Sequence, residues 1–352
     1  MPELKEVFEM VSQKVEPELD AWREQERRQR RTSRNRKIGA LALVAAIVIA
    51  MVVAVLTLPD GGKAQTAENP SPSSASLAGA AVGAQIITLD GSVVERLPEV
   101  VTLGEQPQLS PQGTTIAFFR DDAVWVVARD GTGARALTGP SDDVVGAKNR
   151  VVWSPDGDML AYSWNGEIYL MNADGSNKRR LTHSPEGEGS YAPSWSSDGR
   201  AITFWRGTSA TDNDAPDDSE IYFVGLGGGK PIRLTRDDHA SFQPDASPDG
   251  RIAYRRHDPD DIIVMRGDGS DPRVITPDRL NPWSPAWSQD GSKIAFLRCC
   301  ADHGSFSGRP LLEVVVIDLA TLELQRLGVY VETENNVPQW TSNTTLLVNR
   351  YE

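Results

Sequence analysis

At 352 residues the chain exceeds a typical single domain, so more than one structural unit is expected. Its composition is that of an ordinary globular protein, with 24% charged residues and a net charge of −13. This balance argues against a nucleic-acid partner, because no basic patch remains outside the N-terminal segment.

Residues 1–37 form a highly charged N-terminal segment. Leu4, Phe8, Val11 and Val15 recur at helical spacing, which predicts a short amphipathic helix. The helix is either part of a solvated tail or a docking element for a cytoplasmic regulator, and the sequence leaves both interpretations open.

The next segment, residues 38–58, contains neither a charge nor a proline. About 20 apolar residues span a bilayer, so a single transmembrane helix is predicted here. A cleavable signal peptide fits less well, because the preceding segment is too long and no clear cleavage site follows. Basic residues crowd the N-terminal side, which predicts a cytoplasmic N-terminus and an extracytoplasmic remainder. Residues 59–83, rich in Pro, Ser, Ala and Gly, are expected to form a flexible linker.

Residues 150–182 contain the unit that the rest of the chain repeats. Three turn signals, Ser154-Pro155-Asp156-Gly157, Asn165-Gly166 and Asp174-Gly175, divide this stretch into four short strands. The runs between the turns are apolar at nearly every position, as expected for strands covered on both faces. One small sheet cannot cover two apolar faces, so similar sheets must stack on both sides of it.

The first of these turns recurs along residues 84–352, with a degenerate copy at Thr341–Thr344. The other copies are Ser110-Pro111-Gln112-Gly113, Ser196-Ser197-Asp198-Gly199, Ser247-Pro248-Asp249-Gly250 and Ser288-Gln289-Asp290-Gly291. The turn glycines, at positions 113, 157, 199, 250 and 291, are separated by 44, 42, 51 and 41 residues. A period of about 40–45 residues is that of a β-propeller blade, and it disfavours a β-sandwich with recurrent turns.

The two ends of this region each resemble half of a repeat. Residues 84–97 match its second half, and residues 337–349 match its first half. Joined, the two halves would complete one blade and close the ring without an open edge. We therefore predict an all-β, six-bladed β-propeller over residues 84–352, preceded by the transmembrane helix.

These repeats resemble the WD40-like repeats of the TolB-type β-propeller family. The resemblance is carried by Trp153-Ser154-Pro155-Asp156-Gly157 and Met171-Asn172-Ala173-Asp174-Gly175-Ser176, together with their copies. It implies either a periplasmic interaction module or a propeller that gates access to a serine-peptidase domain, and no such domain is recognised in this sequence. Departures from the pattern occur at Gln112, Ser197, Gln289 and Thr341–Thr344. The layout of cytoplasmic segment, single span and outer domain is also similar to that of anti-sigma-factor-like regulators.

The long insertions are all expected on one face of the ring, where repeat proteins commonly bind their ligands. An acidic insertion carries Asp212, Asp214, Asp217 and Asp218, which could hold calcium or simply be solvated. Further along the chain, His257, Asp258 and His303 are candidates for ligand or transition-metal binding, although they show no tight spacing.

Two further features of this face concern cysteines and aromatic side chains. Cys299 and Cys300 are adjacent, so they could form a vicinal disulfide, remain free thiols, or bind metal together with His303. Three consecutive blades carry Tyr191, Phe242 and Trp283 two positions before the proline of the innermost strand. These aromatics are expected at the mouth of the central channel, where they would either bind a peptide or small ligand or plug the ring.

No nucleophile pattern or phosphate-binding loop is recognisable, so we expect a binding protein and not an enzyme. The expected function is a membrane-anchored, extracytoplasmic propeller that binds a protein, a peptide or an envelope ligand. The alternatives are a transmembrane sensor acting through residues 1–37 and a metal-dependent hydrolase on the loop-bearing face. Apart from calcium, no cofactor is expected.

Overall fold

The computed structural model describes residues 82–102, 105–121, 123–139, 150–208, 218–236, 238–277, 280–299, 305–306, 309–332 and 337–351. The charged segment, the predicted span at 38–58 and nearly all of the predicted linker lie outside the described residues. Within the described ranges, no helix has the length and apolar character needed to cross a bilayer. The first strand begins at Val82, two residues before the predicted start of the propeller.

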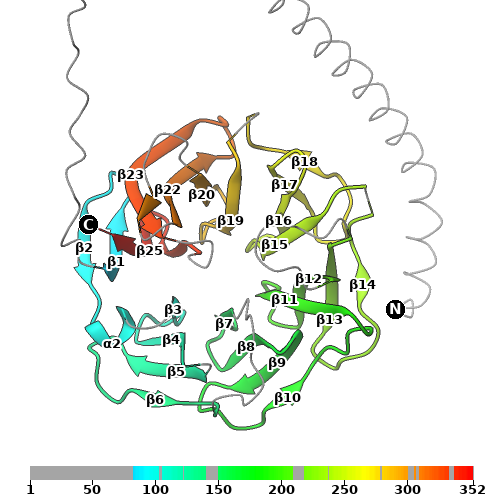
Figure 1. Cartoon of the computed structure of the whole chain (residues 1–352), viewed down its shortest axis with the longest axis horizontal. Coiled ribbons are helices and arrows are strands. Elements are labelled where there is room, and N and C mark those ends of the chain that lie inside the picture. The colour runs from blue at the N-terminus through cyan, green and yellow to red at the C-terminus, as the bar shows by residue number, and fades with distance from the viewer. Residues whose placement is uncertain are drawn as a thin grey trace, which may run out of the picture. The chain divides into compact units, whose positions relative to one another are not determined.

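Six small antiparallel sheets stand around a common axis as the blades of a propeller (Figure 1). Blade 1 contains β3 (Glu105–Leu109), β4 (Thr115–Arg120), β5 (Ala123–Ala128) and β6 (Arg135–Ala136). Blade 2 contains β7 (Val151–Trp153), β8 (Met159–Trp164), β9 (Glu167–Asn172) and β10 (Arg179–Arg180). Blade 3 contains β11 (Glu188–Trp195), β12 (Ala201–Thr208), β13 (Glu220–Gly225) and β14 (Ile232–Arg233). Blade 4 contains β15 (Ser241–Ala246), β16 (Arg251–Arg256), β17 (Asp261–Arg266) and β18 (Arg273–Val274). Blade 5 contains β19 (Pro282–Trp287), β20 (Lys293–Cys299), β21 (Ser305–Phe306), β22 (Arg309–Asp318) and β23 (Leu324–Glu332).

Blade 6 is built from both ends of the propeller. Its order is β2 (Val93–Arg96), β1 (Val82–Thr88), β25 (Thr345–Tyr351) and β24 (Gln339–Ser342). The ladder between β1 and β25 runs without interruption from the pair Val82 and Tyr351 to the pair Thr88 and Thr345. The short helix α2 (Glu99–Thr102) then leads into blade 1. The prediction of a six-bladed ring that is closed by the two chain ends is therefore confirmed.

The hydrophobic core consists of layers between neighbouring blades. In one layer Leu160 and Leu170 of blade 2 pack in the same cluster as Ile202 and Phe204 of blade 3. All four side chains are fully buried. Each blade therefore contributes to two layers, which explains why the strands are apolar on both faces.

The recurrent tryptophan ahead of the first turn joins adjacent blades. In four blades its indole Nε1 donates a hydrogen bond to a carbonyl on the innermost strand of the preceding blade. The pairs are Trp153 to Gln108 at 3.0 Å, Trp195 to Val152 at 3.3 Å, Trp287 to Asp245 at 3.1 Å and Trp340 to Ala286 at 2.9 Å. Blades 1 and 4 have Leu109 and Ala246 at this position, and their backbone amides instead donate to the side chains of Gln339 and Ser194.

In blades 2 to 5 the first turn is held by one serine and one aspartate. In the turn of blade 5, Ser288 Oγ donates to Asp290 Oδ1 at 2.7 Å and accepts from the amide of Lys293 at 2.9 Å. Blades 2, 3 and 4 repeat this arrangement with Asp156, Asp198 and Asp249. The hydrogen bond from Ser288 is the main cause that lowers the pKa of Asp290 to about 2.

We expect the propeller to lose stability as the pH falls from about 4 to about 2. The pKa of each turn carboxyl is lowered in the folded state, so its ionised form stabilises the fold at pH values above its unfolded pKa near 3.8. This contribution disappears as the pH falls through the folded pKa, which is about 2 for Asp290. Urea unfolding midpoints measured across this range test the expectation.

The matched variants for this acid test are Asp290→Asn in the turn and Asp238→Asn at an exposed site between blades 3 and 4. Asp290→Asn should flatten part of the pH dependence because its side chain no longer titrates. Asp238→Asn should leave the dependence unchanged. A pH profile identical in all three proteins would contradict the role of the turn carboxylates.

Candidate functional site

The innermost strands β3, β7, β11, β15 and β19 face the centre of the ring (Figure 1). In four blades the residue before the proline of the innermost strand has a φ between 48° and 53°. These residues are Gln106, Ala192, Gln243 and Ser284. At each of them the pairing with the next strand is interrupted by a bulge. Such bulges redirect side chains, and here they act on the strands that surround the channel.

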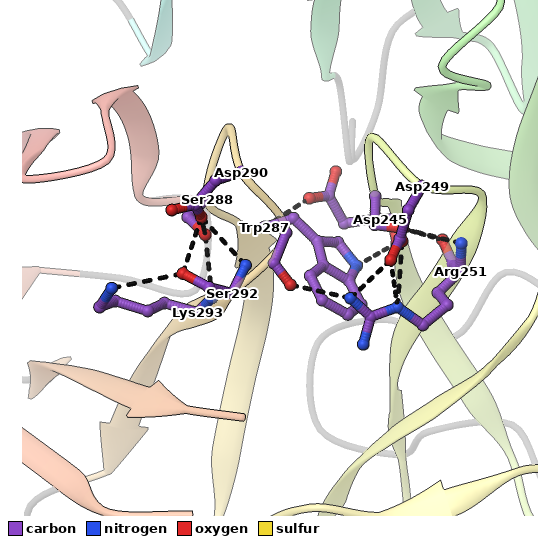
Figure 2. Close-up of polar contacts among 10 residues, drawn as sticks. Asp245, Asp249, Arg251, Trp287, Ser288, Asp290, Ser292 and Lys293 are labelled. Carbon is purple, nitrogen blue, oxygen red and sulfur yellow. Dashed lines mark hydrogen bonds and ion pairs between the residues drawn. The ribbon is translucent and has the colours of Figure 1, made fainter. Parts of the chain in front are cut away.

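Directly after one of these bulges, Asp245 joins four consecutive blades. Its Oδ2 accepts a hydrogen bond from the amide of Trp287 in blade 5 at 2.9 Å, and its Oδ1 accepts one from Ser194 Oγ in blade 3 at 3.1 Å. Arg150, which precedes β7 of blade 2, places its Nη2 atom 3.7 Å from the same Oδ1. Figure 2 shows Asp245 beside the backbone and indole of Trp287.

The ion pair of Arg150 and Asp245 lies inside the ring. Blades 2 and 4 are not neighbours, so the two side chains can meet only along the inner side of blade 3. Their side chains are 8% and 18% exposed, respectively. Burial raises the pKa of Asp245, while the charge of Arg150 opposes that shift, and burial likewise lowers the pKa of Arg150. Sequence analysis singled out neither residue.

A second contact in Figure 2 ties blade 4 to blade 5 near the first turns. The guanidinium of Arg251 lies 4.5 Å from the centroid of the Trp287 ring. Its Nε donates to both carboxylate oxygens of Asp249 at 3.0 Å, and its Nη2 donates to the carbonyl of Gly291 at 2.8 Å. These contacts hold blade 4 against blade 5.

The three predicted channel aromatics contact two residues that the sequence analysis did not single out, Trp205 and Arg255. Trp205 lies between Tyr191 and Phe242, with ring centroids 4.6 and 5.4 Å away. Tyr191 and Phe242 are 9% and 6% exposed and belong to one core cluster. Trp283 packs against the core layer between blades 5 and 6, and the Arg255 guanidinium is 3.4 Å from its ring centroid. This burial favours the packing alternative for Tyr191 and Phe242.

The connection from β16 to β17 carries the predicted residues His257 and Asp258. His257 Nδ1 lies 3.0 Å from Asp260 Oδ1, which also accepts a hydrogen bond from Arg255 Nη2 at 2.6 Å. Asp258 is exposed, and its peptide bond to Pro259 is cis. Arg255 therefore links the loop between β16 and β17 to Trp283. Through Asp260 and Arg255, His257 and Trp283 belong to one network of contacts.

The remaining predicted site residues are divided between described and undescribed parts of the chain. Asp218 is exposed and accepts hydrogen bonds from the amide and hydroxyl of Thr208 at 3.4 and 3.2 Å. Cys299 is half-buried at the end of β20. Asp212, Asp214, Asp217, Cys300 and His303 lie outside the described residues, so calcium binding and the disulfide stay predictions. Among the residues that are described, no three His, Cys, Asp or Glu side chains are grouped to hold a metal.

The two faces of the ring differ in the length of their connections. One face, termed here the turn face, carries the first and third turns of each blade, such as the connection from Trp195 to Ala201. The other, termed here the loop face, carries the connections between blades and the second connection within each blade. The longest second connections run from Thr208 to Glu220 and from Cys299 to Arg309, where β21 is inserted. Both of these connections therefore begin and end at the loop-face ends of their strands.

Comparison with known sequences identifies relatives of the described region. The profile of a family described as PD40, TolB beta propeller domain, matches residues 81–266. The chain is 32% identical over 157 residues to "Uncharacterized protein Atu1656" of Agrobacterium fabrum, covering 42% of this chain and 50% of that protein. It is 26% identical over 212 residues to "Uncharacterized peptidase YuxL" of Bacillus subtilis, covering 54% and 28%. The match thus spans half or less of the length of these curated relatives.

Comparison with solved structures shows the same fold. A protein of Agrobacterium tumefaciens assigned as TolB superposes with a TM-score of 0.61 and 22% identity, covering 78% of this chain and 99% of that one. An oligogalacturonate lyase in complex with manganese superposes with a TM-score of 0.50 and 16% identity, covering 75% and 71%. At these identities the similarity concerns the fold alone.

Proposed function

Because the chain belongs to the family of TolB β-propeller domains, we propose that it is a binding module that holds a protein or peptide partner on its loop face. In this proposal residues 38–58 anchor the protein in the cytoplasmic membrane, and the propeller lies on the outer side. The module performs no catalytic step of its own. An envelope component is the class of partner that this location would supply.

The difference between the two faces is the observation that carries this proposal. The turn face is made of short turns whose side-chain oxygens are already engaged in hydrogen bonds within the turn, as for Ser288 and Asp290. The two longest connections within blades, from Thr208 to Glu220 and from Cys299 to Arg309, join strands at their loop-face ends, and connections of this kind commonly carry binding residues. A repeat protein that elaborates one face only is suited to bind on that face.

The proposed anchor is supported by the sequence of the N-terminal region. Residues 38–58 are uncharged and long enough to cross a bilayer, and basic residues lie on their N-terminal side. The orientation this implies would place residues 1–37 in the cytoplasm, where they could contact a regulator. Retention of the full chain in membranes after alkaline extraction would support the anchor, and release into the soluble fraction would count against it.

Site-specific crosslinking in intact cells tests the binding face. A photoreactive amino acid at Glu186 or Asp238, exposed on the loop face, should capture the same partner from both sites. The matched controls are Ser197 and Lys230, which are exposed on the turn face. We expect adducts from the first pair to be at least about tenfold more abundant. Equal capture from both faces, or capture only from the turn face, would contradict the proposal.

A metal-dependent hydrolase on the loop face is the alternative from a different functional class. Its candidate ligands Asp212, Asp214 and Asp217 lie outside the described residues. Metal analysis of the purified full-length protein separates the alternatives. Stoichiometric, tightly held metal would favour the hydrolase, and its absence would favour the binding module.

A further inference from the structure

The guanidinium of Arg150 is buried without the hydrogen bonds that such a group requires. Its side chain is only 8% exposed, and its Nε atom is buried with no acceptor. The closest carboxylate oxygen, on Asp245, is 3.7 Å from Nη2, which exceeds the roughly 3.2 Å limit of a good hydrogen bond. Within the described part of the chain, the guanidinium donates no hydrogen bond. A buried charge in this state is costly unless another acceptor completes its environment.

Asp245, in contrast, has other partners besides Arg150. The amide of Trp287 donates to Oδ2 at 2.9 Å, and Ser194 Oγ donates to Oδ1 at 3.1 Å. The carboxylate is thus held in place by hydrogen bonds from blades 3 and 5. Arg150 contributes charge but no hydrogen bond to it, so the pairing does not explain why a guanidinium with five donors stands at this position.

Nε, which has no acceptor, and Nη2, which lies 3.7 Å from Asp245 Oδ1, form one edge of the Arg150 guanidinium. Nε and Nη2 lie side by side, and this edge binds the two oxygens of a carboxylate in a bidentate manner. Unpaired neutral groups are also present on the neighbouring innermost strand β3, where Gln106 Oε1 and Gln108 Nε2 are buried without partners. Both glutamines are 6% exposed. The innermost part of blades 1 and 2 therefore contains one charged edge and two additional hydrogen-bonding groups without partners.

We propose that Arg150 anchors a binding site for a small carboxylate inside the ring, with Nε and Nη2 each donating to one ligand oxygen. Asp245 lies beside this site and holds the guanidinium in the channel when no ligand is bound. In its ionised form Asp245 opposes a bound carboxylate and weakens its affinity. This site needs neither a partner on the loop face nor the membrane anchor, so its test is independent of the proposed function.

Ligand titrations of the purified full-length protein test the site, with binding followed by NMR in chloride-free buffer. The probes are acetate and succinate, with inorganic phosphate as a tetrahedral oxyanion and acetamide as the neutral analogue of acetate. Arg150→Gln should weaken binding of the carboxylates by about tenfold or more. Asp245→Asn should strengthen it by about tenfold, because the competing charge is removed while an oxygen acceptor remains.

Two further variants keep the test decisive. Arg150→Gln combined with Asp245→Asn removes both buried charges at once, so it is expected to fold even if the single Arg150 variant does not. Arg266→Gln changes an arginine whose side chain is 69% exposed, and it should bind the carboxylates as the unaltered protein does.

Carboxylate binding that depends on Arg150 and strengthens in Asp245→Asn, with no response to acetamide, would support the site. Unchanged affinity in the double variant would overturn it, because the ligand would then bind elsewhere. Binding of phosphate alone would overturn the assignment to a carboxylate. If Arg150 served only to compensate Asp245, Asp245→Asn would lose stability without gaining affinity, which would also overturn the proposal.

Discussion

Replacing Trp195 with alanine is expected to lower the free energy of unfolding by about 3–5 kcal/mol. The side chain is 6% exposed and packs in the layer between blades 2 and 3. Its indole Nε1 also donates to the carbonyl of Val152 at 3.3 Å, so the substitution removes a hydrogen bond between blades together with the buried ring. Denaturant unfolding of the full-length protein, followed by circular dichroism, measures the change.

Two control variants separate the components of this effect. Trp195→Phe keeps an aromatic ring but removes the donor to Val152, and it should cost less than the alanine variant, with about 1–2 kcal/mol from the lost hydrogen bond. Val94→Ala changes a side chain that is 59% exposed, and it should stay within about 0.5 kcal/mol. A loss below about 1 kcal/mol for Trp195→Ala would contradict the packing of this layer.

The blade itself could be predicted from the sequence because its determinants are local. The Ser-Pro-Asp-Gly turn fixes its own geometry through contacts such as those of Ser154 with Asp156 and with the amide of Met159. Runs that are apolar on both faces require neighbours, and the period of the turns sets the size of each blade. The half-repeats at the two ends predicted the closing sheet for the same reason, since each lacks the strands that the other supplies.

Contacts between blades were less predictable, because they join positions about one repeat apart. Gln112 and Asn343 departed from the repeated turn pattern, yet both side chains bridge adjacent turns in the structure. Gln112 Nε2 donates to the carbonyl of Asp156 at 2.5 Å, and the amide of Asp290 donates to Asn343 Oδ1 at 3.0 Å. A departure from a repeat can thus mark a contact with the neighbouring blade, and a single sequence shows no partner for it.

The candidate site was predicted only in part for a related reason. The repeat shows that Tyr191, Phe242 and Trp283 occupy equivalent positions. It does not show that Trp205 lies between the first two rings or that Arg255 contacts the third. Arg150 and Asp245 lie 95 residues apart in the sequence, in blades that are not neighbours in the ring. Their pairing depends on the curvature of the closed ring, which no local pattern encodes. An alignment of the innermost strands would have shown that Arg150 and Asp245 are charged residues at positions where the other blades have neutral residues.

Deleting residues 339–352 is expected to abolish the cooperative unfolding of the propeller. The deletion removes β24 and β25, so β1 keeps only its pairing with β2 and becomes an open edge on the side where β25 was. It also uncovers the buried layer that Leu346 and Val348 share with Val329 and Val331 of blade 5. The loss should be comparable with the entire stability of a domain, about 5–15 kcal/mol. Loss of a single denaturant transition and rapid proteolysis of the truncated chain would show it.

A permuted chain distinguishes ring closure from a general effect of shortening the protein. Val82 pairs with Tyr351, so a short loop can join the end of β25 to the start of β1 as a hairpin. Moving residues 337–351 to a position directly before residue 82 should therefore restore cooperative unfolding, although the chain then ends after β23. Failure of this permutant, or cooperative unfolding of the simple deletion with an unchanged midpoint, would contradict closure by β1 and β25. The permutant carries the same strands in a different order, so its recovery would assign the stability to the closed sheet itself.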